Sequence, residues 1–573
     1  MAKGRRRPGR QKAGKTPASR VAHGGPANPA GAVAQVVAGL IARDDLTAAS
    51  EHLRAFLNRQ PRHPGLWEKL GVVELNRGRT ASARTAMRRT LLLHPAAAVA
   101  AINLFSLSDG AVSSASLLAI LRRARCTAPG QPHVHYNHGK FRDLELGETG
   151  AAENDYRRTL LLAPAHPRAL INIHRPLSKR EQWATSLLLA RVAVRLMPGE
   201  PLGHQARAVA LKGLDRLVEA KRAYRRAAVL SPSPGDIWYN FGNLAQARGR
   251  DHRAIHLYRR AVMILPANAS YHWNLALAQL LIGDFANGWA SYEWRWRWTA
   301  FPSSPLPKVA PRWRGDLVAG QRLLVVREQG LGDAIHFVRY LAPLRDAGMR
   351  VGLVCAAPLQ RLFTAAKVAE EIFTQSTSLP SFDWEIGMLS LPALLPNHGG
   401  RPVDLSAAVS PPPRRRPGPL RVGLAWAGNP AHRRDAERSV SLDQLAPVLA
   451  VPDIAFIAIQ HGAARREIAR LGLGDRIEDW GDTVDLLAAA ENIVDLDLVI
   501  TIDSALAHLA ASLGVPTWLL ISEPPDWRWH RDGMASRWYP SVRLYRQPHR
   551  KQWAPAIQAV AEDLFTMRVG FTL

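Results

Sequence analysis

The sequence predicts a multidomain chain of α and α/β type, in which an N-terminal α-solenoid is followed by two Rossmann-like domains. Two patterns in the 573 residues support this prediction. In the first half, prolines recur every 34 or 35 residues, which is the spacing of a two-helix repeat. In the second half, short apolar runs alternate with helical segments, which is typical of parallel sheets covered by helices.

The proline ladder lies within residues 29–298, the predicted solenoid. Its members are Pro61, Pro95, Pro129, Pro164, Pro198, Pro232 and Pro266. Within the repeats, Gly71 and Gly242 follow Trp67 and Trp238 by four residues, where a large and a small side chain let two helices pack closely. The period and pattern predict tetratricopeptide-type repeats, which stack into a curved array whose concave face binds a peptide or protein partner.

Some repeats depart from this pattern. Leu91–Pro129 and Ala165–Pro198 match it weakly, so we expect distorted repeats there. An eighth helix pair is expected over Ala269–Arg297, and its end carries the aromatic and basic run Tyr292–Trp298. Such a run could stack on nucleic acid, but at the end of a solenoid we favour packing against the next domain. Nucleic acid is therefore not expected as a partner.

Composition and charge indicate which partners and which cellular compartment to expect. The 75 Lys and Arg against 47 Asp and Glu give a net charge of +28, which favours anionic partners. A GC-rich genome, which encodes Arg in place of Lys, would produce much of the same excess. Cys126 and Cys355 lie far apart, which argues against a disulfide framework. Because no run of about 18 apolar residues occurs, no membrane span is expected. The two separate cysteines fit a reducing compartment, so we expect the chain in the cytoplasm. Residues 1–28 are predicted to be a basic, disordered tail.

The strand–helix rhythm of the second half defines the remaining boundaries. A connector over 299–319 leads to a first Rossmann-like half at 320–409. The Pro- and Arg-rich stretch 410–419 is a linker, and a second half follows at 420–573. Two such halves with a cleft between them form the GT-B architecture, in which we expect the second half to bind a donor.

One strand-to-helix turn in the second half is a candidate anion site. Asp503 and Ser504 follow a buried strand, and Ala505 opens a helix whose free N–H groups suit a phosphate. His508 lies one helical turn later and could face the same ligand. The alternative is a helix cap with a packed histidine.

Two motifs resemble those of a known enzyme family. The run from Gly330 to His336, GLGDAIH, resembles the G-D-x-x-H signature of the ADP-heptose:lipopolysaccharide heptosyltransferases. The run Asp503–Ala510, DSALAHLA, is similar to that family's donor motif. The order of repeats and GT-B pair also resembles the O-linked N-acetylglucosamine transferases. The resemblance implies that Asp333 is the base of an inverting displacement, with Gly330, Gly332 and His336 beside the acceptor.

The local chemistry leaves alternatives open for the base. Asp333 stands in the first turn of a predicted helix, whose dipole is expected to lower the pKa of its carboxyl group. A base that works near pH 7 is better served by a raised pKa. Asp333 could also serve only as a helix cap.

Further donor-binding candidates follow other strands of the second half. Asn429, His432 and Arg438 could offer amide or cationic groups to phosphates, and Arg438 stands where the family has a lysine. Gln460 ends the next strand, although the acidic residue usual in the family is absent. Trp527 could form an exposed stacking wall for a sugar or base, and core packing is equally favoured.

Together these observations predict a glycosyltransferase that moves a sugar from a nucleotide sugar to a protein or glycan acceptor recruited by the repeats. No cofactor or metal is expected, because no D-x-D pair lies near the cleft and charged side chains would balance the diphosphate. The alternative is a non-catalytic tetratricopeptide scaffold whose GT-B half is degenerate or only senses a ligand.

Overall fold

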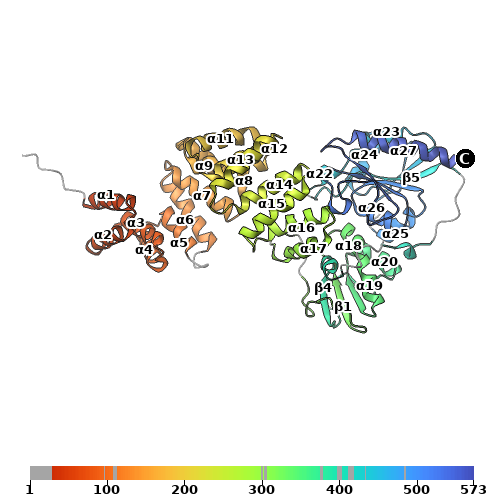
Figure 1. Cartoon of the computed structure of the whole chain (residues 1–573), viewed down its shortest axis with the longest axis horizontal. Helices are drawn as coiled ribbons and strands as arrows, with labels where there is room; N and C mark the ends of the chain where they lie inside the picture. Colours follow the sequence, from red (N-terminus) through yellow and green to blue (C-terminus); the bar gives the residue numbers. More distant parts are fainter. Residues whose placement is uncertain are drawn as a thin grey trace, which may run out of the picture. The chain divides into compact units, whose positions relative to one another are not determined.

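The computed structural model of the chain divides into two compact units, Met1–Asp215 and Arg216–Leu573 (Figure 1). It describes residues 29–95, 97–107, 113–298, 301, 306–374, 379–395, 403–410, 418–432, 434–482 and 485–572. The expected tail 1–28, part of the connector and most of the linker 410–419 lie outside the described residues.

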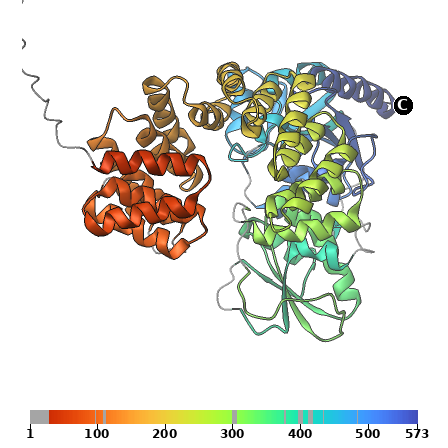
Figure 2. The same cartoon turned by 60° about the vertical axis from the view of Figure 1, so that its left-hand side comes forward.

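The first unit consists of antiparallel helix pairs, which lie side by side in Figure 2. Its helices are α1 (Pro29–Ala42), α2 (Leu46–Arg59), α3 (Pro64–Asn76), α4 (Thr80–Leu93), α5 (Ala98–Ser106), α6 (Ser114–Thr127), α7 (Pro132–Leu144), α8 (Thr149–Leu162), α9 (Pro167–Asn172), α10 (His174–Lys179), α11 (Trp183–Leu196) and α12 (Pro201–Gly213). A methyl group at Gly71 would lie 2.6 Å from the Met87 side chain, so α3 and α4 pack closely because residue 71 has no side chain. The unit is a helical solenoid of tetratricopeptide-like repeats.

The distortion expected over Ala165–Pro198 is confirmed. The first helix of this repeat is interrupted at Ile173, which separates α9 from α10. Pro176 has no N–H to donate to the carbonyl of Asn172, so a continuous helix would lose a hydrogen bond there. The sequence pattern was weak because the repeat is irregular.

The second unit continues the repeats and ends them on an α/β region. Its helical part consists of α13 (Leu217–Leu230), α14 (Gly235–Ala247), α15 (Asp251–Ile264), α16 (Ala269–Leu281), α17 (Phe285–Tyr292) and the 3₁₀ helix η1 (Glu293–Arg297). The pair α16 and α17 is the expected eighth repeat. Its Trp289 lies edge-on to Phe337 and Trp527 at 5.9 and 5.1 Å between ring centres, so the aromatic end of the array packs against the α/β region.

The first sheet has four parallel strands in the order β3-β2-β1-β4, coloured green in Figure 2. They are β1 (Arg322–Val326), β2 (Arg350–Val354), β3 (Glu371–Phe373) and β4 (Trp384–Gly387). Helices α18 (Leu331–Phe337), α19 (Leu341–Asp346), α20 (Ala357–Ala365) and α21 (Leu391–Leu394) accompany them, with the 3₁₀ turns η2 (Val338–Tyr340), η3 (Met388–Ser390) and η5 (Ser406–Ala408).

The second sheet has six parallel strands in the order β10-β9-β8-β5-β6-β7. They are β5 (Leu420–Ala425), β6 (Ile454–Ala458), β7 (Ile477–Asp479), β8 (Leu498–Ile502), β9 (Thr517–Ile521) and β10 (Val542–Arg546). The accompanying helices are α22 (Asp435–Arg438), η6 (Leu442–Leu445), α23 (Ala446–Leu449), η7 (Ala463–Arg465), α24 (Arg466–Arg470), α25 (Leu486–Ile493), α26 (Ala505–Ser512), η8 (Trp527–Trp529) and α27 (Ala554–Thr572). The expected parallel α/β region is thus confirmed.

One hydrophobic core joins the last repeat to both sheets. Its buried members include Leu280 and Trp289 of the repeats, Leu353 of the first sheet, and Val499 and Leu519 of the second. Because these side chains share one cluster, the last repeat and the two sheets pack against one another. This packing positions the loops that form the candidate site.

Candidate functional site at the edge of the second sheet

The candidate site lies at the topological switch point of the second sheet. From β5 the chain proceeds through β6 and β7 on one side and through β8, β9 and β10 on the other. The loops that leave β5 and β8 therefore diverge, and ligands of open α/β sheets bind in the crevice between such loops. Arg438 crosses this point, because its Nη1 donates to the carbonyl oxygen of Asp503 at 3.0 Å. The structure thus brings together two residues that the sequence predicted as donor contacts.

The β5 loop presents further polar groups near this edge. Asn429 and His432 are exposed, and each accepts a local hydrogen bond, from the N–H of Ala431 at 2.9 Å and of Arg434 at 3.2 Å. Desolvation and the charge of Arg438 lower the pKa of His432, so its imidazole is neutral near pH 7. It is a neutral donor rather than a cation.

Gln460 does not face this crevice. It is 2 % exposed, and its Oε1 accepts hydrogen bonds from the N–H groups of Trp426 and Ala427 at 2.9 and 2.8 Å. Its Nε2 donates to the carbonyls of Ala427 and His461 at 3.0 and 2.7 Å. The donor contact predicted for Gln460 is therefore corrected: all polar atoms of this amide hold the start of the β5 loop.

The N-terminus of α26 is partly covered. A methyl group at Gly332 would lie 3.4 Å from Cα of Ala505 and 3.1 Å from Cδ2 of His508, so the turn before α18 lies directly against this helix. Ser504 is the N-cap residue, and its buried Oγ has no hydrogen-bond partner among the described residues. The helix end, with the Ser504 hydroxyl, is therefore closed to a ligand, and the phosphate site expected at this N-terminus is corrected.

Asp333 faces the second sheet across the domain boundary. Its carboxylate accepts a hydrogen bond from the N–H of Gly330 at 3.2 Å and binds the Nη2 of Arg528. Nη1 of Arg528 donates to Asp526 at 2.8 Å, so one guanidinium joins carboxylates from the two domains. Desolvation raises the pKa of Asp333, and the nearby Asp526 adds to this, against the opposing charge of Arg528. The pKa decrease expected from the helix dipole is wrong, because burial outweighs it.

A second carboxylate at this edge has a raised pKa. Desolvation and the neighbouring Asp526 raise the pKa of Asp503 to about 6. For Asp526, burial opposes ionisation, but the charge of Arg528 outweighs it and lowers the pKa. Two carboxylates held close together separate in pKa in this way, and Asp503 carries the proton more readily.

The two motif histidines are structural. His336 is fully buried, His508 is 4 % exposed, and their Nδ1 atoms lie 3.3 and 2.9 Å from the hydroxyl of Tyr539. Desolvation, reinforced by Arg528, lowers the pKa of His508 to about 3, and desolvation and Arg339 lower that of His336. Both rings are neutral and enclosed, so the packed-histidine alternative is correct for His508, and His336 does not line an open cleft.

Trp527 is also a core residue. Its side chain is 4 % exposed and packs against Trp289 of α17, Phe337 of α18 and Trp538. The exposed stacking wall is therefore wrong and the core-packing alternative is right. The aromatic run that contains Trp527 fixes Arg528, whose guanidinium lies 4.4 Å from the centre of the Trp527 ring.

The edge of the first sheet is occupied by the repeats. Glu328 follows β1 at the switch point between β1 and β4 and accepts two hydrogen bonds from Arg295, at 2.7 and 2.8 Å. Arg295 also donates to Ser390 at 2.7 Å, and Glu328 accepts from the N–H of Leu389 at 3.0 Å. Arg295 is 1 % and Glu328 5 % exposed. A buried ion pair therefore fills the crevice of this sheet.

Sequence reasoning missed the residues that join elements. Tyr539, Arg339 and Glu328 were not predicted to contribute, and Arg528 was considered only as part of the stacking wall, yet these residues link the motifs to each other. The usable signal for Arg528 was its place between two tryptophans directly after a buried strand.

Two surveys cover only the described part of the chain. There, no group of three or more His, Cys, Asp or Glu side chains is arranged to hold a metal ion. In the same residues, no helix combines the length and apolarity needed to cross a bilayer.

Comparison with known proteins gives relatives but no family. No protein-family model matches the chain. Protein FlbA of Caulobacter vibrioides is 26% identical over 440 residues, which are 64% of this chain and 73% of that protein. A tetratricopeptide repeat protein from Parabacteroides merdae covers 44% of this chain and 98% of its own length at 17% identity, with a TM-score of 0.33. The Cut9–Hcn1 hetero-tetramer of the APC/C covers 46% of this chain and 52% of its own at 12% identity, with a TM-score of 0.37. Since these names state no reaction, the chemistry has to be inferred from the site.

Proposed function

We propose that the α/β region is a nucleotide-sugar-dependent glycosyltransferase and that the repeats recruit its protein or glycan acceptor. The observation that carries the proposal is the closeness of two turns at this edge: Gly332 lies directly against Ala505, and Arg528 joins Asp333 to Asp526, whose charge acts on Asp503. Arg438 donates to the carbonyl of Asp503 at the same edge. Burial raises the pKa of Asp333, which is the direction that favours a general base near neutral pH.

In the proposed reaction, Asp333 takes the proton of the acceptor hydroxyl while the acceptor oxygen bonds to the anomeric carbon. The bond from that carbon to the phosphate oxygen breaks, and its electron pair leaves with the nucleoside diphosphate. A single displacement of this kind inverts the anomeric centre. Arg438 would bind the departing phosphates, so a charged side chain supplies the stabilisation that a divalent cation gives elsewhere.

A thermal-shift screen with ADP-, UDP- and GDP-sugars tests donor binding, because it needs no acceptor. The nucleotide sugar that stabilises the chain is then used in a donor-hydrolysis or transfer assay. We expect Asp333→Asn to lower turnover at least about 10²-fold and to leave nucleotide affinity within roughly threefold, because the carboxylate acts on the acceptor. Asp316→Asn, which changes an exposed aspartate of the connector just before β1, is the matched control.

A second candidate function is a non-catalytic scaffold with a ligand-sensing α/β region. Repeats of this kind form protein-interaction surfaces, and the pairing of Asp333 with Arg528 is also compatible with a purely structural carboxylate. Binding of a nucleotide sugar without turnover toward any acceptor would favour this function. Turnover that survives Asp333→Asn unchanged would show that Asp333 is not the catalytic base.

A further inference from the structure

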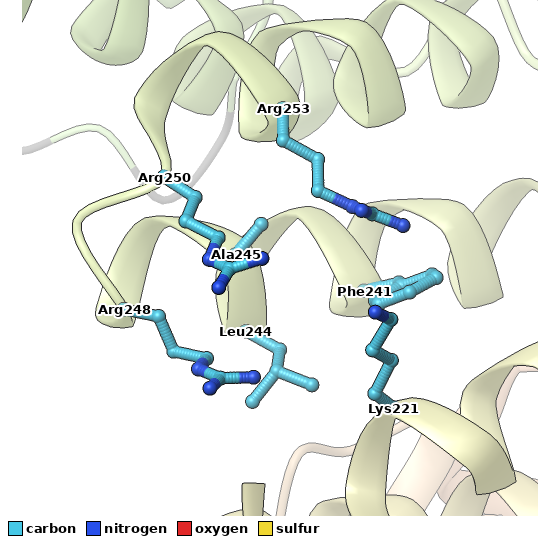
Figure 3. Close-up of a pocket in the computed structure, with 7 residues that line it drawn as sticks. All are labelled: Lys221, Phe241, Leu244, Ala245, Arg248, Arg250 and Arg253. Carbon is cyan, nitrogen blue, oxygen red and sulfur yellow. The ribbon is translucent and has the colours of Figure 1, made fainter. Parts of the chain in front are cut away.

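Cationic side chains surround a shallow hollow on the repeat helices of the second unit. The lining cations are Lys221 from α13, Arg248 and Arg250 from the turn between α14 and α15, and Arg253 from α15. Arg225 of α13, whose charge acts on Lys221, brings the number of cations to five. Figure 3 shows Lys221 and Arg253 on opposite sides of the hollow, with Arg248 and Arg250 at one end. The floor is apolar and consists of Phe241, Leu244 and Ala245, which are all buried.

The charge of this cationic hollow is not balanced by the protein. Within the described part of the chain, none of its five cations forms an ion pair. Asp251, which follows Arg250, binds Arg531 with both carboxylate oxygens, and Arg531 also binds Glu523. The available acid is thus used by the α/β region. Repulsion from Arg225 and Arg253 lowers the pKa of Lys221, which shows that the cations act on one another.

The hollow uses a different face of α14 from the polar cluster beside it. Phe241, Leu244, Ala245 and Arg248 follow the spacing i, i+3, i+4, i+7 and therefore share one face of the helix. Tyr239 and Asn243 belong to another face, where Nδ2 of Asn274 donates to both at 3.0 and 2.8 Å. The polar face is satisfied by its own hydrogen bonds, whereas the cationic face has unpaired donors.

The shape and floor of the hollow discriminate between anionic ligands. Single-stranded nucleic acid needs open aromatic faces on which bases stack. Phe241 is only 3 % exposed, and Arg253 lies over its ring at 5.6 Å, so it offers no such face. Carboxylates on a peptide need only neighbouring cations, which the rim of the hollow supplies.

We propose that this cationic hollow binds an acidic, Asp- and Glu-rich segment of a partner protein. Its carboxylates pair with Arg248, Arg250 and Arg253 on the rim of the hollow. The site is separate from the candidate glycosyl-transfer site and does not depend on the proposed reaction.

Fluorescence anisotropy with the full chain tests the proposal. The probe is a fluorescein-labelled peptide of alternating Glu and Leu residues, and a Gln-for-Glu peptide serves as its neutral counterpart. We expect the acidic peptide alone to bind and Arg250→Glu/Arg253→Glu to weaken it at least about tenfold, since two charge-assisted hydrogen bonds are lost and two like charges are introduced. Arg191→Glu/Arg195→Glu is the matched control, because both arginines are exposed on α11 and the double variant changes the net charge equally. The control should stay within roughly twofold of the wild type.

Three results would overturn the proposal. The first is that the wild type does not bind the acidic peptide, and the second is an equal loss of affinity in both double variants. The third is an RNA oligonucleotide of equal charge that binds the hollow more tightly than the peptide and loses affinity only in Arg250→Glu/Arg253→Glu. If charge reversal unfolds the chain, as judged by circular dichroism, Arg250→Gln/Arg253→Gln replaces it, with the same direction expected.

Discussion

The switch points of the two sheets have the same topology and opposite surroundings. At the first, Glu328 is buried and bound by Arg295 from the end of the repeat array. At the second, Arg438 joins the diverging loops, and His432 beside it is exposed. Parallel topology therefore creates a crevice in each sheet, and the element packed over the crevice decides whether it is filled by protein or left for a ligand.

The edge of the first sheet, which Arg295 and Glu328 fill (the filled edge), is expected to contribute more to stability than the edge of the second sheet (the open edge). Arg295→Met leaves Glu328 buried and unpaired, which should lower the free energy of unfolding by about 3–5 kcal/mol. Urea unfolding followed by tryptophan fluorescence measures this. Arg295→Met/Glu328→Gln should recover part of the loss, because no uncompensated charge remains. A loss below about 1 kcal/mol in the single variant would show that water reaches this edge.

The free energy of unfolding should depend on pH through Asp503, which lies at the open edge. Its pKa of about 6 lies above that of an unfolded aspartate, so the folded state binds the proton more tightly and stability falls as the pH rises from about 4 to 6. Asp503→Asn removes this term and should stabilise the chain by about 1–3 kcal/mol at pH 7, with no gain near pH 3.5. Unfolding curves across this range measure the difference. A gain that is the same at every pH would contradict the assigned pKa.

The hydrogen bonds of Gln460 to the start of the β5 loop are expected to make an intermediate contribution to stability. Gln460→Leu leaves the N–H groups of Trp426 and Ala427 without their acceptor and should lower the free energy of unfolding by about 1–3 kcal/mol. Nucleotide affinity, measured by calorimetry on folded protein, should fall only through the loosened loop. If the affinity were lost with stability unchanged, Gln460 would be a direct donor contact after all.

The smallest stability effect is expected for Arg438 itself. Its side chain is partly exposed, so Arg438→Ala should change the free energy of unfolding by less than about 1 kcal/mol. The same change should weaken nucleotide-sugar binding about tenfold or more, because a charged hydrogen-bond donor to phosphate is lost. Arg438→Ala is thus expected to affect binding more than stability. For Arg295→Met we expect the opposite, a large loss of stability and no direct loss of nucleotide binding. Calorimetric titration and urea unfolding of both variants measure it.

The sequence predicted the repeated and alternating parts of the fold because their signals are local. The ladder prolines mark helix pairs of nearly constant length, and the irregular repeat around Ile173 was recognisable as a weak match. The strands β3, β7 and β10 were not predicted. The first two have three residues each, which is too little alternation to recognise.

The places of Asp333, Asp503 and Arg438 could be predicted because each lies in a segment that follows a strand, whereas their roles in binding or catalysis stay predictions. Residues were misplaced where burial depends on distant partners. His336 contacts Tyr539, which lies 203 residues later, and Trp527 is covered by Trp289 of the repeats. Nothing near either residue in the sequence reveals these partners, so an enclosed side chain resembled an available one.

Hydrogen–deuterium exchange with and without a saturating nucleotide sugar distinguishes the open edge from the filled edge in one experiment. We predict slower exchange in the loop 426–440 and in 503–508, with no change in 327–330 or 388–390, where Arg295 and Glu328 already occupy the crevice. Protection at the first edge, or protection absent from the second while the ligand is bound, would contradict the proposed difference between the two edges.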